Sequence, residues 1–276
     1  MRRDRPFHAP DGEQLLLDAY ESPASTGPKP AVVFVRGGGF TAGDKGEFAR
    51  QAIDVAEAGY LAVEPQYRLA PEYTFPAPLV DVKAAIQWCR ADERVDPQRV
   101  AAVGPSAGAN LAVLAAATAD DPGLEPEQYP GASSALSAAV GYSGIYDFRM
   151  RDGDDTAYLG DSEAALDLAS PVEQADASMP PTLLLHGDAD TVASPQQTAV
   201  MADRPGPPPG GVSAWRRGCP GLPVDGAHHA APYDRTADFL GQHLGTPGED
   251  GGPPSGPDPT QPPSGGAFDG PDRSPR

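Results

Sequence analysis

The stretch that most constrains how this chain can fold is residues 100–112, VAAVGPSAGANLA. Its first four residues are small and apolar, which predicts a buried strand, and the Ala, Leu and Val residues after the serine predict a helix. Gly104 and Gly108 bracket Ser106 in a GxSxG pattern. Because such small neighbours leave room for a sharp turn between strand and helix, we expect the Ser106 hydroxyl at the edge of a sheet.

A serine at such a turn is suited to nucleophilic catalysis. The helix that begins there presents free backbone N–H groups and the positive end of its dipole, which would stabilise an oxyanion beside Ser106. Glycine is common in this chain, with 32 residues, so a GxSxG pentad also arises by chance. The alternative is therefore a turn with no catalytic role. The rest of the chain decides between this and a catalytic serine.

Buried strands are also predicted on both sides of this turn. Residues 31–35 form an apolar run that leads into three glycines at 37–39, and a second run from residue 182 ends in Asp188 and Asp190. Further strands are predicted at residues 13–20, 60–64 and 135–143, with helices at 48–58, 81–90 and 164–168. This alternation predicts an α/β fold, a mostly parallel central sheet with helices on both faces. Sites in such sheets lie beyond the carboxyl ends of the strands, where Ser106 falls.

Composition and charge exclude several function classes. The formal net charge of −19 repels phosphate backbones and anionic membrane surfaces, so we expect neither a nucleic-acid partner nor membrane association. The basic N-terminus leads into no apolar segment, and no apolar run of about 18 residues occurs, which predicts a soluble cytoplasmic protein. Cys89 and Cys219 have neither metal-ligand spacing nor a CxxC context, so we expect no metal site and no structural disulfide.

Serine hydrolysis needs a base, an orienting carboxylate and donors for the oxyanion as well as the nucleophile. After Ser106 the chain supplies Asp188 and Asp190, and then His228 and His229. The other histidines precede the first predicted strand, end a buried strand or fall in the last predicted helix: His8, His186 and His243. The candidates thus follow the chain order serine, aspartate, histidine.

At these positions the chain resembles the α/β-hydrolase family, in particular the carboxylesterases of the hormone-sensitive-lipase and feruloyl-esterase-like groups. The similarity covers residues 13 to about 200 and then 224–244, in the family's order. The stretches that carry it are RGGGF, GDK, YRLAPE, FPA, DVKAAIQW, RVAAVGPSAGANL and PPTLLLHGDAD. The resemblance implies an α/β-hydrolase fold and ester hydrolysis through an acyl-serine intermediate, with no metal or cofactor.

The resemblance also implies roles for individual residues. Ser106 is then the nucleophile, Asp190 the triad acid and His229 the base. Asp190 is preferred to Asp188 because the family's acid is the last residue of the HGxxD pattern. His229 is preferred to His228 because it aligns with the histidine of the family's GxGH pattern. The oxyanion hole would be formed by the backbone N–H groups of Gly38, Gly39 and Ala107.

The chain departs from the family pattern at single positions and over one segment. Arg36 replaces the histidine that usually begins and braces the glycine loop, and an arginine has no acceptor and a permanent charge. Pro105 replaces the usual Asp before the nucleophile, and Ala109 replaces a frequent Gly. Residues 203–223 are rich in proline and glycine, which excludes a helix or strand over most of the span where the family has its final strand.

Two interpretations of residues 203–223 stay open, a pair of compensating shifts in the reading frame and a true proline-rich surface loop. Without a final strand, His229 would be poorly anchored. A displacement of about 1 Å in a catalytic group can cost on the order of a hundredfold in rate, so we expect weakened activity.

These observations predict one α/β-hydrolase domain over residues 1–244, with an atypical segment at 203–223, and a disordered tail over 245–276. We expect no N-terminal cap, with residues 149–180 as the only lid material. The predicted function is that of a short-chain carboxylesterase acting on small-molecule esters, as a monomer or homodimer. The alternatives are a formamidase or amidase-type hydrolase on the same triad, and a catalytically weakened hydrolase-fold binding protein.

Overall fold

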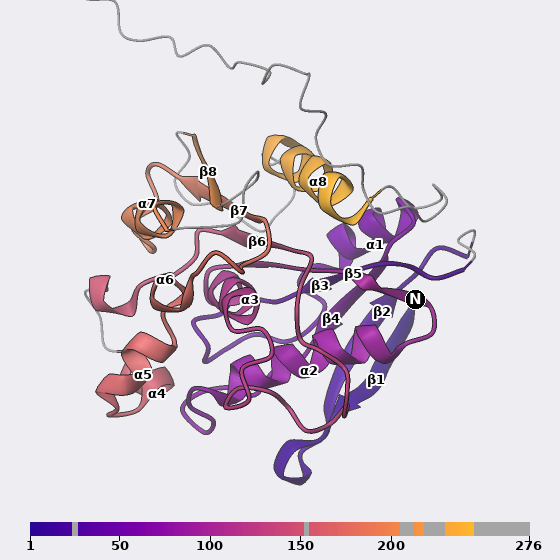
Figure 1. Ribbon diagram of the computed structural model, residues 1–276, viewed down its shortest axis with the longest axis horizontal. Helices are drawn as coiled ribbons and strands as arrows, with labels where there is room; N and C mark the ends of the chain where they lie inside the picture. Colours follow the sequence, from indigo (N-terminus) through magenta and orange to yellow (C-terminus); the bar gives the residue numbers. More distant parts are fainter. Residues whose placement is uncertain (24–26, 152–154, 205–211, 218–229, 246–276) are drawn as a thin grey trace, which may run out of the picture.

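The computed structural model describes residues 1–23, 27–151, 155–204, 212–217 and 230–245. Its centre is an eight-stranded sheet in the order β1-β2-β4-β3-β5-β6-β7-β8 (Figure 1). The strands from β4 to β8 in this order run parallel, whereas β2 pairs antiparallel with both β4 and β1. The strands are β1 Arg2–His8, β2 Leu15–Tyr20, β3 Lys29–Phe34, β4 Leu61–Pro65, β5 Val95–Pro105, β6 Ala138–Tyr142, β7 Thr182–Gly187 and β8 Val212–Arg217.

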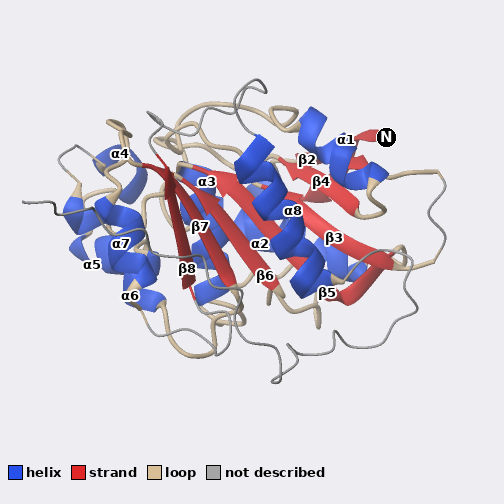
Figure 2. Ribbon diagram, turned by 90° about the horizontal axis from the view of Figure 1, so that it is seen from above, coloured by secondary structure: helices blue, strands red, loops and turns tan. Residues whose placement is uncertain are grey.

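Helices cover both faces of the sheet, as Figure 2 shows with α8 and α1 in front of the strands. One face carries α1 (Ala49–Glu57) and α8 (Ala230–Leu244), and the other carries α2 (Ala77–Ala91), α3 (Ala107–Ala117) and α7 (Gln196–Ala202). Shorter elements are the 3-10 turns at Pro10–Gly12 and Phe148–Met150 and the helices α4 Thr156–Leu159, α5 Glu163–Leu168 and α6 Pro171–Gln174. Within the described residues, every helix is too short or too polar to cross a lipid bilayer.

The apolar runs of the sequence form central strands because both of their faces are covered. In β3, Val32 packs into the core layer under α1 and α8, and Val33 packs into the layer under α2 and α3. Both side chains are fully buried. A strand buried on both faces has no reason to alternate with polar residues. The predicted mostly parallel sheet with helices on both faces is therefore confirmed.

The structure has a first strand that the sequence analysis missed. β1 pairs with β2 at the edge of the sheet, and five of its seven residues are exposed. Its sequence, RRDRPFH, has no apolar alternation because an edge strand needs only its backbone groups to pair. The expectation that His8 precedes the first strand was thus wrong, since His8 ends β1.

The segment 203–223 contains the strand that its composition was expected to exclude. β8 pairs parallel with β7 along its whole length, from Val212 opposite Thr182 to Arg217 opposite Gly187. The expectation was wrong because the prolines and glycines flank the six residues VSAWRR and none lies among them. Residues 205–211 and 218–223 lie outside the described residues, as does the predicted tail beyond Gly245.

Candidate active site

Ser106 lies at the sharp turn between β5 and α3. Its backbone has φ 51° and ψ −119°, a combination that few residues with a side chain adopt. Two hydrogen bonds hold the turn: the Ser106 N–H donates to the Tyr142 carbonyl on β6 (2.8 Å), and the Ser106 carbonyl accepts from the Asn110 N–H in α3 (3.1 Å). The strand, turn and helix predicted around Ser106 are therefore present.

The two glycines of the GxSxG pattern are required by close contact between backbones. A Cβ placed on Gly104 would lie 2.5 Å from the Val35 carbonyl oxygen, and one on Gly108 would lie 2.0 Å from the same oxygen. Real side chains do not approach a backbone atom this closely. The glycines therefore let the turn at Ser106 pack directly against the end of β3, where the glycine loop begins.

The glycine loop at residues 37–39 runs beside the candidate nucleophile. A Cβ on Gly37 would lie 3.7 Å from the Ser106 Cβ. Gly38 has φ +103° and leaves no room for a Cβ, which would meet the Ala42 carbonyl oxygen at 2.1 Å. The Gly38 carbonyl accepts hydrogen bonds from the N–H groups of Thr41 (3.1 Å) and Ala42 (3.0 Å). The fold thus brings the loop and Ser106 together, although they are far apart in sequence.

Arg36 lies behind this loop with 3% of its surface exposed. Its guanidinium group donates to the carbonyls of Gly37 (3.2 Å), Tyr67 (3.3 Å) and Ala42, and it stacks on the Tyr67 ring at 3.9 Å from the centroid. The Tyr67 hydroxyl in turn donates to the carbonyls of Arg36 and Gly37, both at 3.1 Å. Burial raises the pKa of Tyr67 to about 12, so the phenol keeps its proton. Arginine therefore braces the loop at the position where the family usually has histidine.

Asp190 follows β7 and is fixed by backbone donors. Its Oδ1 accepts hydrogen bonds from the N–H groups of Val192 (2.9 Å) and Ala193 (3.0 Å), and its own N–H donates to the Gly187 carbonyl (3.1 Å). Asp188, in contrast, is exposed. Only β6 lies between β7 and the strand that leads to Ser106. Of the two aspartates, the geometry favours Asp190 as the orienting carboxylate.

His229 and His228 lie outside the described residues. The described histidines have other partners as well, and His186 Nε2 lies 3.7 Å from Asp190 Oδ2. The His186 ring is held by Thr198 Oγ1 (2.7 Å) and the Ala193 carbonyl (2.9 Å), behind the turn of Asp190. His243 packs on the Phe239 ring at the end of α8, and His8 lies in β1. His228 and His229 therefore stay sequence-based predictions for the histidine base.

Residue 229 directly precedes α8, and α8 is attached to the sheet near the turn of Ser106. The Tyr142 hydroxyl lies 2.5 Å from the Thr236 Oγ1, and Gln51 of α1 donates to the Tyr233 hydroxyl at 2.7 Å. Tyr142 is the residue whose carbonyl holds the Ser106 N–H. Sequence reasoning missed Tyr142 and Thr236, because nothing local to either residue signals a contact over 94 positions.

Comparison with known proteins agrees with this geometry. The BD-FAE family model matches residues 17–204. The chain belongs to the BD-FAE family. The predicted resemblance to carboxylesterases of the hormone-sensitive-lipase and feruloyl-esterase-like group is thereby confirmed.

Two relatives of this BD-FAE protein come from Mycobacterium tuberculosis. Esterase LipQ is 33% identical over 218 residues, which cover 71% of this chain and 50% of LipQ. The probable carboxylic ester hydrolase LipM is 34% identical over 213 residues, which cover 70% of this chain and 49% of LipM. The chain thus spans about half the length of these relatives.

Solved structures with the same fold include Thermogutta terrifontis esterase 2. Its propionate-bound form has a TM-score of 0.72 and 25% identity, covering 90% of this chain and 96% of the esterase. The form phosphoramylated by tabun has a TM-score of 0.73 and 25% identity, covering 89% of this chain and 95% of the esterase. The chain therefore has the α/β-hydrolase fold of these esterases.

Proposed function

We propose that this BD-FAE family member is a serine carboxylesterase that hydrolyses short-chain esters of small molecules. The observation that carries the proposal is the contact between the strained turn of Ser106 and the glycine loop, with 3.7 Å between the Ser106 Cβ and a Cβ placed on Gly37. This contact supports a site in which the Ser106 hydroxyl lies beside the backbone N–H groups of the glycine loop. A nucleophile next to oxyanion donors is the arrangement that acyl transfer requires.

In the proposed reaction, His229 takes the Ser106 proton while the Ser106 Oγ attacks the ester carbonyl carbon. The oxyanion that forms accepts hydrogen bonds from the N–H groups of Gly38, Gly39 and Ala107. His229 then protonates the leaving alcohol, and an acyl-Ser106 intermediate is left. Water activated by His229 releases the acid. Asp190, held by two backbone N–H groups, orients the imidazole and stabilises its charged form.

Support for the role of His229 comes from the helix that follows it. The bond between Tyr142 and Thr236 ties the first turns of α8 to β6, beside Ser106. β8, the strand that was expected to be missing, is paired with β7 before the chain reaches this region. The pairing of β8 removes the reason for expecting weakened activity, since that expectation rested on the absence of a final strand.

The short-chain preference is supported by the relative whose structures hold propionate and butyrate. Small esters as substrates, a cytoplasmic location, and a monomer or homodimer with neither nucleic-acid nor membrane partners complete the proposal. The net charge of −19 supports the absence of anionic partners.

Hydrolysis of p-nitrophenyl acetate, butyrate and decanoate tests this function. We expect turnover of the two shorter esters, which Ser106→Ala abolishes together with labelling by a fluorophosphonate probe. Asp190→Asn should lower kcat on the order of 10⁴-fold, whereas the matched exposed variant Asp188→Asn should stay within about twofold of the parent. A fluorophosphonate that does not label the parent protein, or faster hydrolysis of an N-formyl arylamine than of the esters, would overturn the proposal.

A further inference from the structure

We infer that Arg36 and Tyr67 act together as positioning residues that aim the N–H groups of the glycine loop at the oxyanion. The inference rests on the proposed ester hydrolysis at Ser106. It concerns this chain's own departure from the family pattern, since Arg36 stands where the loop usually begins with histidine.

The peptide group between Gly37 and Gly38 is held through its carbonyl. Its carbonyl accepts two hydrogen bonds, from Arg36 Nη1 (3.2 Å) and from the Tyr67 hydroxyl (3.1 Å). The peptide group is planar and trans, so its C=O and N–H point in opposite directions. With the carbonyl held toward Arg36 and Tyr67, the Gly38 N–H must point away from them. Gly37 itself lies beside Ser106, since a Cβ placed on it would lie 3.7 Å from the Ser106 Cβ.

The next peptide is held in the same manner from within the loop. The Gly38 carbonyl accepts from the N–H groups of Thr41 (3.1 Å) and Ala42 (3.0 Å), which turns the Gly39 N–H to the opposite side. The Ala42 carbonyl is itself bonded to Arg36 Nη1. The guanidinium group therefore ties together the two ends of the turn that contains Gly38 and Gly39.

Burial makes this arrangement rigid. Arg36 and Tyr67 are each 3% exposed, and the ring stacks on the guanidinium group. The hydrogen-bond partners of Arg36 are backbone carbonyls, and within the described part of the chain no carboxylate forms an ion pair with it. The Asp44 carboxylate feels this charge, because Arg36 is one of the groups that lower the pKa of Asp44. The direct partners of the guanidinium group are nevertheless the loop carbonyls, so its main contact is with the backbone that it positions.

A histidine could not make the same set of contacts. An imidazole has two nitrogens, whereas the planar guanidinium group here reaches three carbonyls. The substitution therefore gives this chain a loop that one side chain supports at three carbonyls.

The test measures kcat and KM separately for Arg36→Gln and Tyr67→Phe with p-nitrophenyl butyrate. The oxyanion exists only in the transition state and the intermediates, so a positioning role lowers kcat and leaves KM nearly unchanged. We expect kcat to fall about 10- to 100-fold in Arg36→Gln and about tenfold in Tyr67→Phe, with KM within about twofold. The affinity for a trifluoromethyl ketone, whose adduct carries an oxyanion, should fall by the same factor as kcat/KM.

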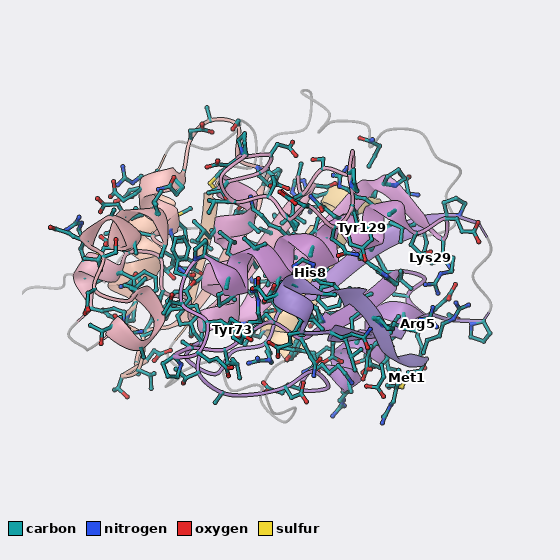
Figure 3. The ribbon with its side chains drawn as sticks, turned by 90° about the horizontal axis from the view of Figure 1, so that it is seen from below. Met1, Arg5, His8, Lys29, Tyr73 and Tyr129 are labelled. Atoms are coloured by element: carbon teal, nitrogen blue, oxygen red, sulfur yellow. The ribbon has the colours of Figure 1, made fainter. Side chains whose placement is uncertain are left out.

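Matched controls come from two side chains that also donate to backbone carbonyls, but far from the loop. Arg90 donates to the Ala135 carbonyl (2.6 Å), and Tyr129 donates to the Phe7 carbonyl; Tyr129 is labelled in Figure 3. Arg90→Gln and Tyr129→Phe should lower the melting temperature without changing kcat by more than about twofold. Tyr67→Phe removes a single hydroxyl, so it keeps the test usable if Arg36→Gln does not fold.

Folded Arg36→Gln and Tyr67→Phe variants that keep the parent kcat would overturn the inference. A rise in KM with an unchanged kcat would overturn it as well. A parent protein that is neither active nor labelled by a fluorophosphonate would instead refute the proposed function.

Discussion

The hydroxyl oxygens of Tyr142 and Thr236 lie 2.5 Å apart and join strand β6 to helix α8. Thr236 gives its own proton to the Pro232 carbonyl (3.0 Å), so Tyr142 is the donor of the shared bond. The carbonyl of the same tyrosine accepts the Ser106 N–H. One residue thus connects the turn of the candidate nucleophile to the helix that follows the candidate base.

Replacement of Tyr142 by Phe should therefore lower activity. We expect kcat to fall about tenfold, because the start of α8 loses an attachment and small displacements of a catalytic group are costly. The free energy of unfolding should fall by about 1 kcal/mol. Kinetics with p-nitrophenyl butyrate and urea unfolding measure the two effects.

Tyr60→Phe is the control for this variant. The Tyr60 hydroxyl donates to the Gly245 carbonyl (3.2 Å) just beyond the opposite end of α8. We expect a similar loss of stability and an unchanged kcat. An equal effect of both variants on kcat would contradict the special role of Tyr142.

Gly108→Ala should disrupt the turn at Ser106. The new Cβ would lie 2.0 Å from the Val35 carbonyl oxygen, and neither backbone can move without shifting β3 or α3. We expect a loss of about 3 kcal/mol in the free energy of unfolding, together with loss of esterase activity. Gly241→Ala in α8 meets open space and should instead stabilise the protein by about 0.5–1 kcal/mol. A stable, active Gly108→Ala protein would show that the contact is not as tight as described.

Asp81→Asn should destabilise the loop that carries the YRLAPE stretch. Asp81 is fully buried and accepts from the Arg68 N–H and from Arg68 Nε, both at 2.9 Å. Removing its charge leaves the Arg68 guanidinium without its buried partner, which costs about 3 kcal/mol. Asp11, the exposed second partner of Arg68, provides the comparison: Asp11→Asn should cost less than about 1 kcal/mol. Urea unfolding of the two variants decides whether burial determines the difference.

His8 should make stability depend on pH. Burial, and then the positive charge of Arg68, lower the pKa of His8 from 6.5 to about 4 (Figure 3 labels the residue). Between these values the unfolded chain binds a proton that the folded protein does not. Stability from this group is therefore fully present above pH 6.5 and is lost as the pH falls toward 4, by about 3 kcal/mol in total.

Unfolding free energies at pH 7.5 and pH 4.5 measure this effect. His8→Gln cannot titrate, so the drop in stability between the two pH values should be smaller in the variant by about 2 kcal/mol. Equal drops in the parent and in His8→Gln would assign the acid sensitivity to other groups.

The central sheet and the turn of Ser106 could be predicted because their signals are local. The apolar run of β3 follows from its burial on both faces of a parallel sheet. The glycines around Ser106 follow from the close approach of this turn to the Val35 carbonyl. β1 gave no such signal, since its pairing with β2 uses backbone groups and its side chains are mostly exposed. β8 was missed because the composition of a long segment concealed a run of six residues without proline or glycine.

The support of the candidate site was harder to foresee than its reacting groups. Ser106 and Asp190 belong to short motifs, whereas Tyr67 and Thr236 take their roles from contacts between distant segments. Arg36 was noted as a departure from the family pattern, but its three carbonyl partners became visible only in the folded chain.

The edge strand β1 also affects how copies of this protein can meet. Its outer backbone groups could template strand addition by a neighbouring chain, yet Arg2, Arg3 and Arg5 give this edge an excess of positive charge that a second copy would share. The pairing of β1 with β2 is moreover interrupted by two register shifts, which bend the strand away from a straight template. Aggregation through this edge is therefore disfavoured, and a homodimer would have to use another face of the molecule.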